Sequence, residues 1–215
     1  MSAKEQRIDQ DETSRRLAHL YQLLMKAEET YEETESIPTT DFKEIYTEDG
    51  ANGTKVGRGE HPYQVIYAEI AREHLKFLGK VFMPYAMRTI NDGVEFISFT
   101  LDTGEYVIFQ GEENRVSLPM PSGVTSAHTH PGVCLFSGQD LETADFLFIK
   151  GYVSVGVMNP ECALLIYRDG PYTLEDRDAL LNLTKRVKSS KKLNDLVNAY
   201  LSFKTENLKL MQHKF

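Results

Sequence analysis

Two apolar runs in the second half of the chain constrain its fold more than any other feature. Residues 152–158 and 163–167 are almost continuously hydrophobic, and Asn159-Pro160 supplies a turn between them. A strand with one wet face alternates between apolar and polar residues, whereas a strand covered on both faces does not need to. We therefore expect these runs to be central strands with helices on both faces, which is an α/β fold.

The rest of the chain divides into elements that hydrophobic periodicity and turn residues predict. In chain order these are a helix at 13–34, a strand from Tyr63 to Ile70, a helix at 72–87 that Pro84 should disturb, hairpin strands at 94–101 and 105–110, short strands at 115–118 and 124–128, and helices at 140–150, at 173–188 and from 190 onward. Residues 1–12 are polar and are expected to fray. Residues 36–62 are rich in Pro, Gly, Asn and Thr and are expected to be a linker or a flap over a site.

Bulk composition excludes several classes of protein. The 215 residues suffice for one domain with additions, or for two at most. A net charge of −8 argues against nucleic acid as a partner, and the basic run at 185–192 is expected to be a solvated helix junction. No apolar stretch resembles a signal peptide or a membrane span. Cys134 and Cys162 lack metal-site spacing and do not form a disulfide framework, so we expect reduced thiols and a cytoplasmic protein.

A short motif carries the most specific chemical signal. His128 and His130 are two residues apart, so in an extended segment both rings point to the same face. Pro131-Gly132 then turns the chain, and Ser137 is placed to cap a helix whose first turn holds Asp140. Two imidazoles and a carboxylate are a ligand set of catalytic zinc that leaves one position for water. Ser137-x-x-Asp140 is also a capping box, a purely structural alternative that is compatible with metal binding.

The order Glu … His-x-His-Pro … Ser-x-x-Asp resembles the motif of the JAMM (MPN-plus) zinc metalloproteases, which include deubiquitinating isopeptidases and archaeal and bacterial relatives. The resemblance covers residues 63–170 and implies a cytidine deaminase-like MPN core, a mixed sheet flanked by helices. Residues 1–62 would then be an N-terminal helix and connection, and residues 171–215 a C-terminal helical extension. This chain has one residue fewer between the second histidine and the serine than the family usually has.

The resemblance also implies roles for individual residues. His128, His130 and Asp140 would hold Zn²⁺, and the Ser137 hydroxyl would support the oxyanion. The family's glutamate, which handles the proton of the zinc-bound water, stands three residues before a glycine, and Glu95 holds that position relative to the small Ser98. The competing acids are Glu105, which lies beside a hairpin turn, and Glu69, which lies on the wrong segment.

The expected function is hydrolysis of an amide bond at the C-terminal tail of a ubiquitin-like or sulfur-carrier protein. One alternative is a non-catalytic MPN-type scaffold, although scaffold members generally lack the full ligand set. Another is a nucleotide deaminase, which would need His-x-Glu and Pro-Cys-x-x-Cys, and neither is present. The terminal helices would serve partner binding or self-association. Cys134 is expected to be a buried free thiol or, alternatively, a thiolate that reversibly occupies the open zinc position.

Overall fold

The computed structural model describes residues 6–34, 64–111 and 121–215. One seven-stranded mixed sheet runs through it in the order β1-β3-β2-β4-β5-β6-β7. The strands are β1 (Gln6–Gln10), β2 (Phe96–Leu101), β3 (Glu105–Gln110), β4 (Gly123–Thr129), β5 (Ser154–Met158), β6 (Cys162–Arg168) and β7 (Leu208–Lys214). The helices are α1 (Glu12–Thr34), α3 (Gln64–Phe77), the π-helical η1 (Leu78–Phe82), α4 (Met83–Asp92), α5 (Gly138–Ile149), α6 (Leu174–Ser189) and α7 (Leu193–Leu201).

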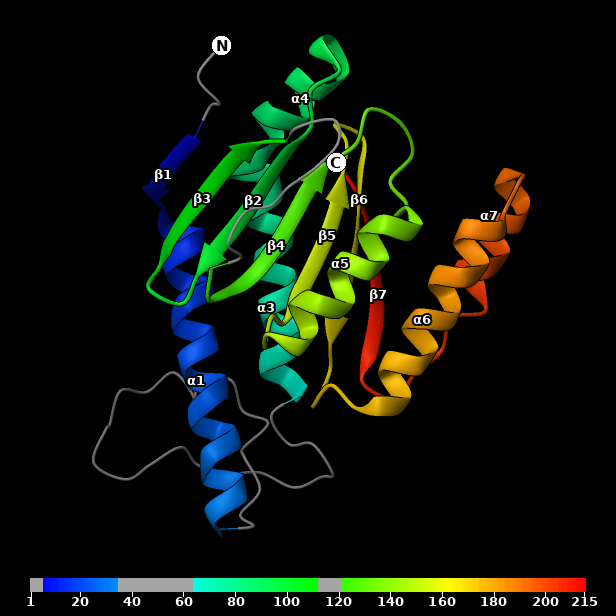
Figure 1. The fold of residues 1–215 in the computed structure, drawn as a ribbon. Helices are drawn as coiled ribbons and strands as arrows, with labels where there is room; N and C mark the ends of the chain where they lie inside the picture. Colours follow the sequence, from blue (N-terminus) through cyan, green and yellow to red (C-terminus); the bar gives the residue numbers. More distant parts are fainter. Residues whose placement is uncertain (1–5, 35–63, 112–120) are drawn as a thin grey trace.

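Helices cover both faces of the sheet, as the apolar runs predicted. In Figure 1, α3 and α4 lie behind the sheet and α5 lies in front of it. Strand β6 alternates between the two cores. Ala163 and Leu165 pack with residues of α1, α3 and α4, whereas Leu164 and Ile166 pack with residues of α5, α6 and α7. The central strands are therefore buried on both sides, and the general α/β class is confirmed.

The connection between β4 and β5 positions the carboxyl end of β4. These two strands are parallel, whereas every other neighbouring pair in the described sheet is antiparallel. Parallel neighbours need a crossover, and α5 supplies it. As a result, the end of β4 and the first turn of α5 meet at the same edge of the sheet.

Three of the sequence-based assignments are wrong in type or incomplete. Residues 63–70 were expected to form a strand, but α3 covers Gln64–Phe77. Ile66, Tyr67 and Ile70 are fully buried, and α3 packs along α1, so a helical repeat of apolar residues was misread as alternation. Residues 1–12 were expected to fray, but Gln6–Gln10 pairs with β3 through backbone bonds while its side chains stay exposed. Strand β7 was not predicted.

The helical segment predicted at 72–87 is interrupted near Pro84, as expected, but it continues through a π-helical stretch rather than ending. Proline lacks an amide hydrogen and is tolerated in the first turn of a helix. The π-helical segment Leu78–Phe82 ends directly before α4, which begins at Met83, and Pro84 occupies the first turn of α4. The predicted hairpin of β2 and β3 and the predicted strand at 124–128 are confirmed, as are the helices near 13–34, 140–150 and 173–188 and the last helix, which begins at Leu193.

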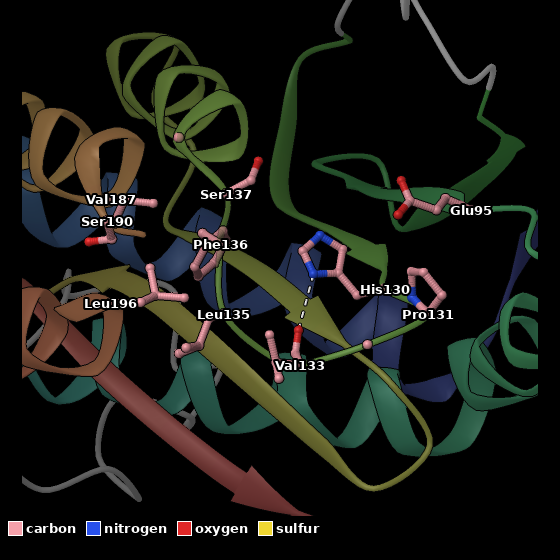
Figure 2. Close-up of a pocket in the computed structure, with 12 residues that line it drawn as sticks. Glu95, His130, Pro131, Val133, Leu135, Phe136, Ser137, Val187, Ser190 and Leu196 are labelled. Carbon is pink, nitrogen blue, oxygen red and sulfur yellow. Dashed lines mark hydrogen bonds between the residues drawn. The ribbon is translucent and has the colours of Figure 1, made fainter. Parts of the chain in front are cut away.

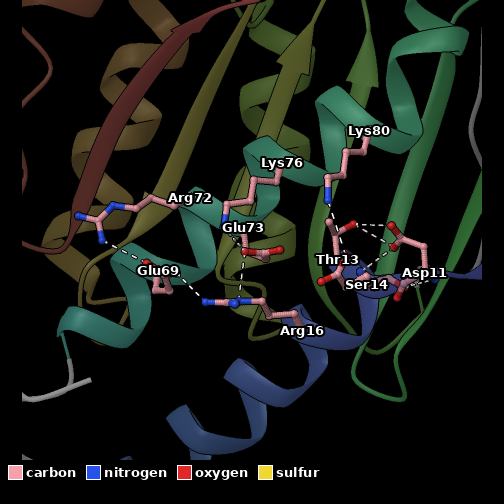
Figure 3. Close-up of polar contacts among 10 residues, drawn as sticks. Asp11, Thr13, Ser14, Arg16, Glu69, Arg72, Glu73, Lys76 and Lys80 are labelled. Carbon is pink, nitrogen blue, oxygen red and sulfur yellow. Dashed lines mark hydrogen bonds and ion pairs between the residues drawn. The ribbon is translucent and has the colours of Figure 1, made fainter. Parts of the chain in front are cut away.

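A polar network joins α1 to α3 (Figure 3). Glu73 of α3 is almost fully buried, and its Oε2 lies 3.2 Å from Arg16 Nε and 2.8 Å from Lys76 Nζ. Asp11 accepts the Ser14 amide hydrogen at 2.8 Å and so caps the start of α1. A buried carboxylate needs such charged partners. The pair between Arg16 and Glu73 joins α1 to α3 here.

Two predictions lie outside the described residues: the connection at 36–62, with its alternative as a flap, and the short strand at 115–118. Among the described helices, none is both long enough and apolar enough to cross a membrane.

Candidate metal centre

The carboxyl end of β4 delivers both histidines. His128 is the second-to-last residue of β4, and His130 follows the strand with its amide bonded to the Met158 carbonyl of β5 at 2.8 Å. This bond extends the parallel ladder by one step, so the two rings keep the same-face orientation of an extended segment. Their Nε2 atoms are 2.9 Å apart.

Helix α5 delivers the carboxylate through its cap. The Ser137 side chain accepts the Asp140 amide hydrogen at 3.2 Å, and the Asp140 carboxylate accepts the Ser137 amide hydrogen at 2.6 Å. This capping box fixes the Asp140 rotamer. The same carboxylate then faces both rings, with Oδ1 at 3.2 Å from His128 Nε2 and Oδ2 at 3.4 Å from His130 Nε2. The capping box is therefore formed, and it leaves the carboxylate in a position that is compatible with metal binding.

The three side chains each bring one possible ligand atom within 4.8 Å of the others. Bonds of about 2.0–2.1 Å to tetrahedral zinc place neighbouring ligand atoms about 3.3 Å apart. The two Nε2 atoms are 2.9 Å apart, and Asp140 approaches the rings with different oxygens, Oδ1 at 3.2 Å from His128 and Oδ2 at 3.4 Å from His130. These residues are also the one group of three metal-ligand side chains that converges within the described part of the chain.

Hydrogen bonding orients His130 for this role. Its Nδ1 lies 3.2 Å from the Val133 carbonyl oxygen (Figure 2), which requires a proton on Nδ1, so in the neutral ring Nε2 carries the lone pair that a metal would use. Metal-binding histidines usually have such a second partner.

The electrostatics of the cluster reflect its converging charges. Burial opposes the charged form of His130, but the hydrogen bond and charge of Asp140 outweigh it and raise the pKa of His130. Burial likewise opposes ionisation of Asp140, but hydrogen bonds from His128, His130 and Ser137 hold its pKa far below the usual range. The cluster therefore provides an ionised carboxylate, which is the form that binds a metal.

The two remaining predicted residues lie around the same hollow, which has a volume of about 450 Å³. Glu95 is exposed directly before β2 and lines the hollow together with His130 and Ser137. Figure 2 shows its carboxylate extending toward the side on which His130 lies. The competitor Glu105 begins β3, accepts a hydrogen bond from Thr103 and does not line the hollow. Glu69 pairs with Arg16 at the α1–α3 contact, away from the histidines.

The shorter loop still brings Ser137 to the hollow. In the cap its hydroxyl acts as an acceptor, so the hydroxyl hydrogen is available for donation. Ser98, which the resemblance aligns with a glycine, is buried, and its hydroxyl donates to the Ala127 carbonyl of the neighbouring strand at 3.3 Å.

The prediction for Cys134 is wrong. Cys134 and Cys162 form a disulfide, with their Cα atoms 6.1 Å apart. The cysteines are 28 residues apart in sequence, but the loop between His130 and Ser137 (the ligand loop) passes the start of β6, where Cys162 lies. Cys134 is therefore neither a free packing thiol nor a thiolate that reaches the open metal position. Instead it ties the loop between His130 and Ser137 to the sheet.

Two further residues hold this loop and were not predicted. Asn159 donates to the Gly132 carbonyl at 2.6 Å, and Tyr200 of α7 donates to the Phe136 carbonyl at 2.6 Å. The turn at Asn159-Pro160 was visible in the sequence, but no local signal connects either residue with the histidines.

Comparison of the chain with protein-family models, with curated proteins and with solved structures finds no match in any of the three.

Proposed function

We propose that this protein is a zinc-dependent peptidase or isopeptidase of the JAMM (MPN-plus) type. Its substrate would be an amide bond at the C-terminal tail of a ubiquitin-like or sulfur-carrier protein. The observation that carries the proposal is the convergence of His128, His130 and Asp140 donor atoms, which lie within 4.8 Å of one another, beside a hollow that Glu95 and Ser137 also line. An extended tail is a suitable ligand for such an open hollow.

The donor set fits zinc because it combines two neutral nitrogens with one carboxylate oxygen. A bound zinc ion would lower the pKa of a water molecule and polarise a carbonyl group. Glu95 accepts the proton of the attacking water and returns it to the departing amine, a lysine side chain in an isopeptide. The Ser137 hydroxyl donates to the carbonyl oxygen as negative charge develops on it. Ser137 also starts α5, whose N-terminal dipole favours negative charge at the same place.

The test combines metal analysis with a cleavage assay. We expect about one zinc per chain, and chelator-sensitive cleavage of linear and isopeptide-linked ubiquitin-like fusions. The Glu95→Gln variant should keep its zinc but lose activity by about 10²- to 10⁴-fold, because general acid–base catalysis contributes that much. Glu105→Gln is the matched control and should retain full activity. Stoichiometric zinc without any cleavage would favour the non-catalytic scaffold, and full activity of Glu95→Gln would remove Glu95 from its role.

A cytoplasmic location is part of the proposal, and the disulfide bears on it. Disulfides are rare in a reducing cytosol, so a closed Cys134–Cys162 bond in the cell would argue for another compartment. Rapid alkylation of thiols in intact cells, followed by mass spectrometry, measures which state is present.

A further inference from the structure

The hollow beside the metal centre extends well beyond the proposed catalytic residues. Beyond Ser137 its walls are mostly apolar and come partly from the C-terminal helices, with Leu135 from the loop between His130 and Ser137, Val187 from α6 and Leu196 from α7. Ser190, in the connection between the two helices, completes this wall. A volume of about 450 Å³ exceeds what catalysis at one amide bond needs and is typical of ligand pockets.

The catalytic groups define the two directions in this hollow. In Figure 2, Glu95 lies on one side of His130, and Leu196, Val187 and Ser190 lie on the other. In the proposed reaction Glu95 protonates the departing amine, so the leaving group must occupy the side of Glu95. The acyl part of the substrate must then extend in the opposite direction, toward α6 and α7.

The charge around this end of the hollow favours one kind of substrate segment. Five of the eight residues from 185 to 192 are basic and none is acidic, although the whole chain carries a net charge of −8. Lys188 pairs with Glu142 at 2.5 Å, whereas Lys191 and Lys192 are exposed in the connection that contains Ser190. An acidic segment would be attracted to this connection, and a basic segment would be repelled.

We propose that the α6–α7 end of the hollow is a specificity subsite for the acyl side of the substrate. The hollow between Leu135, Val187 and Leu196 receives an aliphatic side chain upstream of the scissile bond, and Lys191 and Lys192 face acidic residues further upstream. This inference rests on the proposed function for its direction along the substrate, but not for the existence of the subsite.

The test uses the full-length zinc-loaded protein and acetylated peptides that end in Gly-Gly-aminomethylcoumarin. A single leucine is moved through the upstream positions of an otherwise alanine peptide. We expect leucine at one position to raise kcat/KM by about tenfold, because burying a leucine side chain in a partly open pocket is worth that much. In Leu196→Ala the enlarged hollow should shift the preference from leucine to phenylalanine at the same position.

Leu193→Ala is the matched control, because Leu193 is on the same helix, is 58% exposed and does not line the hollow. It should leave the leucine-to-alanine ratio unchanged. The role of Lys191 and Lys192 is tested with peptides that carry glutamate or lysine upstream of the leucine. The wild type should prefer glutamate, and the double variant Lys191→Glu/Lys192→Glu should prefer lysine. An unchanged charge preference in this variant would overturn that part of the proposal.

Binding measurements separate failure of the subsite from failure of the proposed function. The same peptides, with a free Gly-Gly carboxylate and a fluorescent label, are titrated by fluorescence polarisation. Leucine-dependent binding that Leu196→Ala weakens, without any cleavage, would support the subsite and contradict the peptidase. Cleavage without leucine preference, or absence of both cleavage and leucine-dependent binding, would overturn the subsite. The subsite would also be overturned if the protein were a dimer that Leu196→Ala dissociates while the peptide selectivity stays unchanged, because Leu196 would then serve self-association.

Discussion

Helices α5 and α6 begin with the same pattern, a hydroxyl residue followed three positions later by an aspartate, and both patterns form complete capping boxes. Their surroundings differ. Asp140 is partly exposed and faces His128 and His130 at 3.2 and 3.4 Å. Asp176 is fully buried and accepts hydrogen bonds from the backbone and side-chain amides of Asn207 at 3.0 and 3.1 Å.

A capping box therefore fixes the conformation of a carboxylate but does not determine whether that carboxylate serves a site or the stability of the fold. In both helices the box holds one rotamer by local bonds. The Asp140 oxygens also face the two imidazoles, beside the hollow. The Asp176 oxygens instead accept hydrogen bonds from the Asn207 amides, which connect the segment before β7 to α6. One acid is thus available for metal chemistry, and the other stabilises the fold.

The largest expected contrast comes from neutralising the two acids. Asp140→Asn should weaken zinc binding by at least about 100-fold, since even residues that only support metal ligands contribute 10- to 100-fold. Asp176→Asn should keep its zinc but lower the free energy of unfolding by about 1–3 kcal/mol, because it disturbs buried hydrogen bonds. Zinc titration and urea unfolding of both variants measure the contrast. Equal zinc affinity in the two variants would contradict the proposed metal centre.

Removing the two hydroxyl groups gives a smaller contrast. Ser137→Ala and Thr173→Ala each lose a helix cap, so both should lower the free energy of unfolding by about 0.5–2 kcal/mol. Ser137→Ala should in addition lower kcat by about 100-fold, because it removes a donor to the carbonyl oxygen. Steady-state kinetics on a cleaved fusion compare the variants. A kcat that falls equally in both would mean that Ser137 acts only through the stability of its helix.

The smallest effect concerns pH. Burial opposes ionisation of Asp176, but the amides of Asn207 and Thr173 outweigh it and lower its pKa. The carboxylate therefore contributes its full stabilisation above about pH 4, the pKa in the unfolded chain, and loses it as the pH falls toward the folded-state pKa. The stability difference between wild type and Asp176→Asn should shrink below pH 4, by at most about 1.4 kcal/mol per pH unit. A constant difference down to pH 2 would contradict this assignment.

Local patterns in the sequence were sufficient for the features that neighbouring residues create. The capping boxes at Ser137 and Thr173 and the same-face placement of His128 and His130 depend on contacts within a few residues. The two-sided burial of residues 163–166 was predictable because a strand without polar alternation has no face for water. For the same reason, short apolar stretches such as 63–70 were ambiguous, since burial alone does not separate a helix from a strand.

Tertiary packing decided the features that join distant segments. The Cys134–Cys162 disulfide, the Tyr200 bond to the loop after His130 and the position of Leu196 in the hollow that His130 also lines connect residues 28 or more positions apart. No local pattern encodes them, because they depend on where the β4–α5–β5 crossover and the C-terminal helices pack. The sequence by itself determined which side chains offer metal-binding chemistry. The fold alone decided that their donor atoms converge beside a hollow, because convergence depends on the relative positions of β4 and α5.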